Sequence, residues 1–168
     1  MRIVSWNCQG EYRNKIDKLL QLKPDIAIIQ ECENLEKLHP TCGNKLPEQR
    51  FWFGGDYPHK GLGVFFHQNY DIELMESDNN IEFIIPIKVK AEHEFILFAI
   101  WAMWNEDKSK AFTGQIVEAI NNYYELLKEN NSILIGDYNS PNIEKSTVVE
   151  QFKELGYSSA YHRYYKEN

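Results

Sequence analysis

The chain has 168 residues, a length that fits one domain, and aromatic residues make up 14% of it, which excludes intrinsic disorder over most of its length. Its formal net charge is −7, and an acidic chain repels a polyanion unless a metal ion or a local basic patch intervenes. We expect a cytoplasmic protein with no membrane partner, because no apolar run approaches the roughly 18 residues of a membrane helix and the N-terminus lacks a signal peptide's apolar stretch.

The first part of the chain predicts a strand, a helix and a second strand. Residues 2–7 are rich in strand-forming side chains, and residues 12–22 place apolar side chains at helical spacing. Residues 26–30 form an uninterrupted apolar run, typical of a parallel strand that is buried on both faces. The order predicts a βαβ unit. The polar stretch 31–50 contains two prolines and a glycine, and it predicts a loop.

The middle of the chain predicts strands that are separated by short turns, over residues 51–53, 62–66, 70–75, 81–89 and 94–101. Because connections this short favour antiparallel neighbours, we expect a meander, either separate from the parallel part or mixed into it. The rest of the chain predicts a helix, a buried strand and a second helix, over residues 112–129, 132–136 and 142–155.

The chain has three cysteines, Cys8, Cys32 and Cys42. An odd number without a secretory signal predicts reduced thiols. Their spacing fits none of the usual zinc frameworks, which repeat a pair of closely spaced ligands. We therefore expect small, buried side chains.

Polar side chains directly follow three of the buried-looking strands. Asn7 ends the first, Glu31 follows the second, and Asp137 and Asn139 follow the strand over 132–136. Each residue alone also fits a turn or a solvated loop. Ligands bind beyond the carboxyl ends of strands in α/β sheets, so parallel neighbouring strands would bring these residues together. Carboxylate and amide oxygens suit Mg²⁺ (or Mn²⁺), and such a site can polarise a phosphoryl oxygen and activate a bound water.

Three segments resemble, in order, motifs of the endonuclease/exonuclease/phosphatase superfamily, which includes apurinic endonucleases, pancreatic-type deoxyribonucleases and inositol polyphosphate phosphatases. The segments are Ser-Trp-Asn-Cys-Gln-Gly at 5–10, Lys-Pro-Asp-Ile-Ala-Ile-Ile-Gln-Glu at 23–31 and Ile-Gly-Asp-Tyr-Asn-Ser at 135–140. The resemblance covers about residues 1–161. It implies an α/β fold, a four-layer α/β/β/α sandwich in which two mixed sheets pack face to face.

The resemblance also implies roles for the residues at the strand ends. Glu31 would bind the metal, and Asn7 would orient that carboxylate and help to hold metal or phosphate. Asp137 would position or deprotonate the attacking water, and Asn139 would help to hold the nucleophile and the phosphate. Catalytic residues would thus be Asp137, Asn139 and Asn7, with Glu31 and Asn7 at the metal.

The sequence departs from the family pattern after the strand over 94–101. The family usually has a tyrosine or similar phosphate-contacting residue there, often followed by proline and asparagine. This chain has Trp101-Ala102-Met103-Trp104-Asn105. Trp101 or Trp104 could face the substrate, with Trp104 as the candidate for substrate binding, although both also fit a packed core.

A second departure concerns the family's final strands and their Ser-Asp-His block. That histidine contacts the scissile phosphate, and the sequence holds no match for the block. We assign its role to none of the five histidines. The resemblance therefore predicts a single domain over residues 1–168 that is incomplete at its C-terminus, lacks those strands and leaves open sheet edges.

These observations favour a nuclease-like, metal-dependent phosphoesterase that hydrolyses phosphodiester or phosphomonoester bonds, with weak activity in this chain because the histidine is absent. Its partner would be a phosphate-ester substrate, with nucleic acid as one candidate. Two alternatives remain: a small-molecule or inositol or lipid phosphatase, which the net charge of −7 fits at least as well; and a catalytically incomplete fragment or interaction module, whose open edges would pair with a partner strand. The sequence leaves the oligomeric state open.

Overall fold

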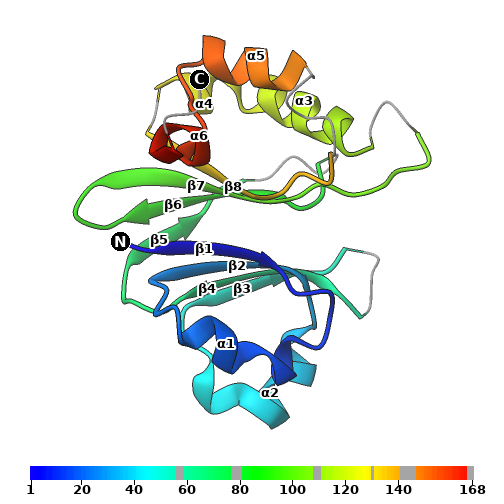
Figure 1. The fold of residues 1–168 in the computed structure, drawn as a ribbon, viewed down its shortest axis with the longest axis vertical. Coiled ribbons are helices and arrows are strands. Elements are labelled where there is room, and N and C mark those ends of the chain that lie inside the picture. Colours follow the sequence, from blue (N-terminus) through cyan, green and yellow to red (C-terminus); the bar gives the residue numbers. More distant parts are fainter. Residues whose placement is uncertain (56–58, 77–80, 108–110, 130, 141–146, 166–168) are drawn as a thin grey trace.

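Two mixed β-sheets packed face to face form the centre of the computed structural model, with helices on both outer faces (Figure 1). The structure describes residues 1–55, 59–76, 81–107, 111–129, 131–140 and 147–165. In these residues the first sheet has the order β1-β2-β4-β3 and the second the order β5-β6-β7-β8. The pairs β1/β2 and β7/β8 are parallel and the other pairs are antiparallel. This arrangement confirms the predicted α/β/β/α sandwich with mixed sheets.

The strands of the first sheet are β1 (Ile3–Asn7), β2 (Ile26–Cys32), β3 (Arg50–Phe53) and β4 (Gly61–Phe66). Those of the second sheet are β5 (Asp71–Leu74), β6 (Ile84–Lys90), β7 (Glu94–Trp101) and β8 (Ser132–Asp137). Seen along the layers, β1 and β8 lie at the same side of the sandwich (Figure 1).

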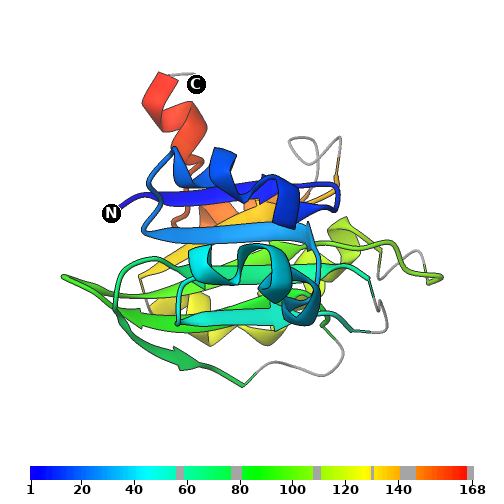
Figure 2. The same ribbon diagram turned by 90° about the horizontal axis from the view of Figure 1, so that it is seen from below.

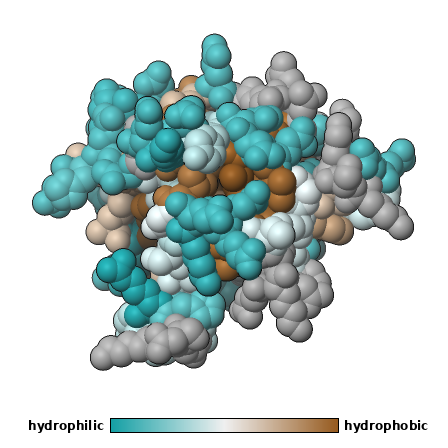
Figure 3. All heavy atoms as spheres, turned by 90° about the horizontal axis from the view of Figure 1, so that it is seen from above, coloured by the Kyte–Doolittle hydropathy of each residue, from teal (hydrophilic) through white to brown (hydrophobic). Residues whose placement is uncertain are grey.

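Helices cover the outer face of each sheet. The first sheet is covered by α1 (Ile16–Leu20) and α2 (Leu35–Cys42), and the second by α3 (Thr113–Asn122), α4 (Tyr124–Glu129) and α5 (Thr147–Glu154) (Figures 1 and 2). The last helix, α6 (Ala160–Tyr165), has no buried residue and projects beyond the β1 side of the sandwich (Figure 2). From the side of α3 and α5, hydrophilic residues surround a strip of hydrophobic ones (Figure 3).

The apolar run of β2 is uninterrupted because both of its faces are covered. Ile26 and Ile28 pack against the second sheet, whereas Ala27 and Ile29 pack against the helices of the first. A strand with two buried faces has no polar side to alternate with. This strand therefore carries its polar functional side chains only at its end.

The predicted meander is confirmed at three hairpins and wrong at one connection. The pairs β3/β4, β5/β6 and β6/β7 are antiparallel neighbours. At residues 67–70, however, the chain leaves β4 and crosses to the second sheet, where it begins β5. The reason is that β4 already pairs with β2 on one side and β3 on the other. No edge of β4 is left for β5.

The predicted loop over 31–50 is also corrected, because it contains α2. The Asn34 side chain accepts a hydrogen bond from the backbone N–H of Lys37 at 3.0 Å, which caps the helix. Leu38 and Cys42 are buried on its inner face. Pro40 lies inside this short helix and hides its pattern in the sequence.

Other boundaries shift by a few residues. The predicted helix over 112–129 is two helices, α3 and α4, that meet at Tyr123. The predicted strand over 81–89 begins only at Ile84. The start of the predicted helix over 142–155 lies outside the described residues, and α5 occupies its second half.

Cys8, Cys32 and Cys42 are free and buried, as predicted. Burial raises the pKa of the Cys8 and Cys32 thiols above the usual range, because a thiolate is poorly solvated there. A protonated thiol is a weak nucleophile, so these side chains are packing groups. Among the described helices, none is long and apolar enough to cross a membrane.

Candidate active site

Asn7, Glu31 and Asp137 meet at one end of the sandwich. The Asn7 Nδ2 atom lies 2.8 Å from Asp137 Oδ2 and 3.4 Å from Glu31 Oε1. The amide group therefore donates to both carboxylates. The sequence predicted this convergence from parallel neighbouring strands. In fact only β1 and β2 are neighbours in a sheet, and β8 brings Asp137 from the second sheet, which packs on the first.

The orientation of the Asn7 amide is fixed from its other side. Its Oδ1 atom accepts the backbone N–H of Gln9 at 3.0 Å, so its NH₂ group faces the carboxylates. The following loop is held by Lys15, whose ammonium donates to the carbonyl oxygens of Cys8 at 2.6 Å and Gly10 at 2.9 Å. The donor is thus held in place by the loop that follows β1.

Glu31 reaches the site because β2 is irregular at this point. Its φ of 56° is left-handed, and the pairing of β2 with β4 shifts register between Ile29 and Cys32. Gln30, fully buried, turns inward, and its Nε2 atom donates to Ser5 Oγ at 3.1 Å and, across the sheets, to the Ile100 carbonyl at 3.2 Å. The bulge leaves the Glu31 side chain 26% exposed at the rim.

Asp137 is held by the turn that follows β8. Its Oδ1 atom accepts the backbone N–H of Asn139 at 2.9 Å, an Asx turn in which Asn139 has a φ of 45°. The Asn139 side chain donates to the Ala102 carbonyl at 2.9 Å, and the Ala102 N–H donates to the Asp137 carbonyl at 2.8 Å. These bonds join the ends of β7 and β8, so both carboxylate oxygens of Asp137 have fixed donors.

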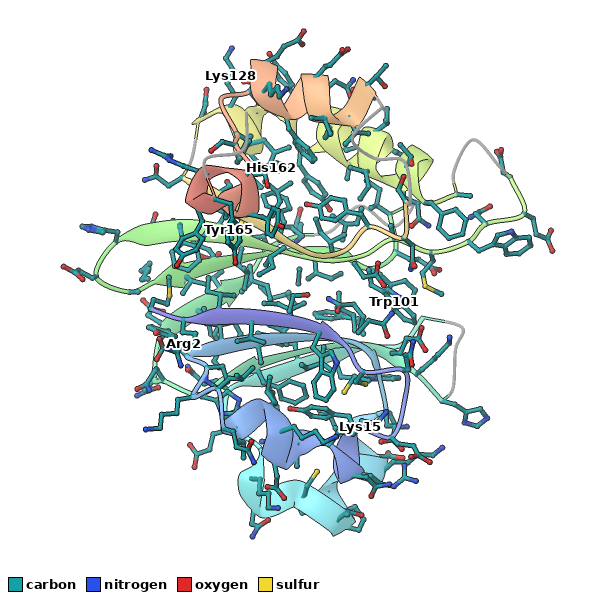
Figure 4. All side chains as sticks on the ribbon, in the orientation of Figure 1. Arg2, Lys15, Trp101, Lys128, His162 and Tyr165 are labelled. Carbon is teal, nitrogen blue, oxygen red and sulfur yellow. The ribbon has the colours of Figure 1, made fainter. Side chains whose placement is uncertain are left out.

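Lys60 and Trp101 lie beside these carboxylates, and nothing in the sequence pattern points to Lys60. The Lys60 Nζ atom lies 3.5 Å from Glu31 Oε2 and 5.6 Å from the centre of the Trp101 ring. Trp101 is buried between the sheets, at the end where β1 and β2 finish (Figure 4). Its indole N–H has no hydrogen-bond partner among the described residues.

The other candidates, Trp104 and the histidines, form no hydrogen bond or ion pair with the carboxylates among the described residues. Trp104 is 61% exposed in the segment that follows β7, two residues beyond Ala102, and no hydrogen bond or ring contact joins it to Asn7, Glu31 or Asp137 among the described residues. In the part of the chain that the structure describes, no hydrogen bond joins a histidine to Asn7, Glu31 or Asp137. The sequence could not reveal Lys60, because its proximity to Glu31 depends on the antiparallel pairing of β4 with β2.

The donor set suits one kind of cation. The two carboxylates offer hard oxygen ligands, as Mg²⁺ and Mn²⁺ prefer, and Mg²⁺ is often held by one or two carboxylates with water and substrate phosphate. The Asn7 oxygen, which the sequence predicted at the metal, instead accepts the Gln9 N–H and faces away from the carboxylates. Among the described residues no group of three or more histidine, cysteine or acidic side chains is placed to bind a metal together. Glu31 and Asp137 are the residues of this site that could contribute oxygen ligands to a cation, and the described residues do not form the closed ligand set of a zinc centre.

Comparison with known proteins places the fold. No family model and no curated protein sequence matches the chain. Among solved structures, an AP endonuclease from Archaeoglobus fulgidus matches with a TM-score of 0.66 and 18% identity, over 100% of this chain and 76% of that one. The human Nocturnin catalytic domain, solved with a bound sulfate anion, matches with a TM-score of 0.65 and 18% identity, over 96% and 72%.

The endonuclease domain of TRAS1, a telomere-specific non-LTR retrotransposon, also matches, with a TM-score of 0.65 and 17% identity, over 92% of this chain and 72% of that one. These proteins share the endonuclease/exonuclease/phosphatase fold, and this chain has the same fold. The resemblance noted in the sequence is thereby confirmed at the level of the fold.

Proposed function

We propose that the protein is a metal-dependent phosphoesterase, with Glu31 as the metal ligand and Asp137 as the group that orients and deprotonates the attacking water. One observation carries the proposal: a single amide group, that of Asn7, donates to both carboxylates. Two carboxylates a few ångströms apart repel each other, and Asn7 and Lys60 offset only part of that repulsion. Such a pair is suited to share a divalent cation and a reacting water.

Each residue has a separate task in the proposed reaction. Bound Mg²⁺ or Mn²⁺ supplies positive charge that stabilises the phosphoryl oxygens and lowers the pKa of water. Asp137 accepts the proton of the attacking water, and the donors on its two oxygens, Asn7 and the Asn139 backbone, prevent the carboxylate from rotating. Asn7 also donates to Glu31, which orients that ligand. Asn139 bonds to the Ala102 carbonyl and so fixes the turn after β8, beside which the attacking water would be held.

The exposed Trp104 side chain favours the proposal of a substrate that carries an aromatic group. An exposed indole in the segment that follows β7 offers a face on which a nucleobase can stack, and such stacking contributes about 1–3 kcal/mol per base. The net charge of −7 disfavours the binding of long, polyanionic duplex DNA. We therefore propose a nucleotide or short single-stranded nucleic acid as substrate, in preference to duplex DNA.

Hydrolysis assays of the purified 168-residue protein test the function. We expect cleavage of bis-p-nitrophenyl phosphate and of a dinucleotide in Mg²⁺ or Mn²⁺, loss of cleavage with a chelator, and recovery when the metal is restored. Glu31→Gln is expected to bring the rate close to the uncatalysed one, because an amide group replaces the charged metal ligand. Glu73→Gln is the control, since Glu73 lies on β5 in an exposed position of the second sheet. Cleavage that survives both the chelator and Glu31→Gln would contradict the proposal.

A further inference from the structure

The Lys60 ammonium occupies the side of Glu31 that the structure leaves accessible. Its Nζ atom lies 3.5 Å from Glu31 Oε2, whereas Asn7 approaches the other oxygen, Oε1. The Lys60 side chain is 42% exposed and that of Glu31 is 26% exposed, so solvent reaches the pair. A positive charge at this place balances one of the two negative charges of the site.

The position of Lys60 follows from the strand that begins after it. Gly61 opens β4 and pairs with Cys32, the residue after Glu31. A side chain at position 61 would overlap the carbonyl oxygen of Phe53, so β3 and β4 approach closely here and the backbone before Gly61 is held near Glu31. On its other side the ammonium lies over the Trp101 ring, which attracts cations through its negative face.

We propose that Lys60 is a built-in counter-cation that competes with the divalent metal for Glu31. The ion pair neutralises the Glu31 charge without metal, and metal binding must draw the carboxylate away from the ammonium. Lys60 thereby lowers the affinity for metal. Once released, the ammonium remains beside the site, where an anionic phosphate ester can accept its hydrogen bonds. This inference rests on the proposed metal role of Glu31.

The sign of one mutational effect separates this role from a structural one. If Lys60 only positioned Glu31, its removal would weaken metal binding. If Lys60 competes with the metal, its removal strengthens binding. The expected gain in affinity for the metal is about three- to tenfold, which is the effect expected from removing one partly exposed charge a few ångströms from the carboxylate. It should shrink as salt is raised, because salt screens exposed charges.

Isothermal titration calorimetry of the full chain with Mn²⁺ alone tests the inference. Lys60→Met is expected to lower the Kd for Mn²⁺ by about three- to tenfold, and Lys60→Arg, which keeps the charge, is expected to stay near the wild-type value. Lys45→Met is the matched control: it removes a lysine that pairs with Asp17 at 2.8 Å on the surface, and it should leave the Kd unchanged.

The outcomes distinguish this inference from the proposed function. A Kd that is unchanged or higher in Lys60→Met overturns the counter-cation role, while the metal role of Glu31 stands if Glu31→Gln abolishes binding. Binding of Mn²⁺ that is the same in wild type and Glu31→Gln overturns the metal role itself, and the inference with it. Equal gains in Lys60→Met and Lys45→Met would indicate a general charge effect and would also overturn the inference.

Discussion

Asp137→Asn is expected to lower kcat for phosphodiester hydrolysis by about 10²–10⁴-fold, the range that general-base catalysis contributes. The substitution replaces one carboxylate oxygen with an NH₂ group. Both oxygens of Asp137 accept hydrogen bonds, from Asn7 Nδ2 and from the Asn139 backbone, so one donor then faces another donor. Steady-state kinetics in saturating Mg²⁺ measure the effect, and we expect kcat to fall more than KM changes.

Asp71→Asn is the control for this experiment. Asp71 is exposed on β5, where it pairs with Lys90 at 2.9 Å, and its loss of charge should leave kcat unchanged. Circular dichroism of both variants establishes that they are folded. If folded Asp137→Asn retained more than about a tenth of the wild-type kcat, far above the range for a general base, Asp137 would not be the base.

Gly136→Ala is expected to cost about 3 kcal/mol or more of unfolding free energy. Gly136 lies next to Ile100 of β7 and has a φ of 156°. A Cβ atom at this position would overlap the backbone carbonyl oxygen of Ile100. Since a backbone oxygen cannot turn away as a flexible side chain can, β8 would have to separate from β7 beside Asp137. Urea denaturation measures the loss.

Gly156→Ala provides the comparison for that loss. Gly156 also has a positive φ, 87°, but a Cβ there would meet nothing within 4 Å. Its substitution should therefore cost only the strain of the left-handed conformation, about 1–2 kcal/mol. Equal losses in the two variants would show that backbone strain alone, and not the close approach of β7 and β8, explains the need for glycine at position 136.

The meeting of polar side chains from three strand ends is the feature that the sequence predicted and the structure shows. Asn7, Glu31 and Asp137 each follow a buried strand, and a polar residue in that position is visible in the sequence. The sequence alone does not show which sheet a strand joins, so Asp137 was expected from a neighbouring strand and instead comes from the facing sheet. The resemblance to a known family supplied the two-sheet arrangement that the residue pattern could not.

Contacts between distant segments explain what the sequence did not predict. Lys60 is 29 positions from Glu31 and follows no strand, so only the antiparallel pairing of β4 with β2 brings the two charges together. The helix α2 was hidden by Pro40, although Asn34 supplies a cap that the sequence does contain. In both cases tertiary packing decides the outcome and local preference does not.

Anomalous diffraction from crystals soaked in Mn²⁺ tests whether Glu31 binds the metal. We expect an anomalous peak that contacts the Glu31 carboxylate, at the metal–oxygen distance of about 2.1 Å typical of such ions, with the Lys60 ammonium moved away from that oxygen. A peak confined to another acidic group, such as Glu92, Glu94 and Glu129 around the β6–β7 turn, or the absence of any peak at Glu31, would contradict it.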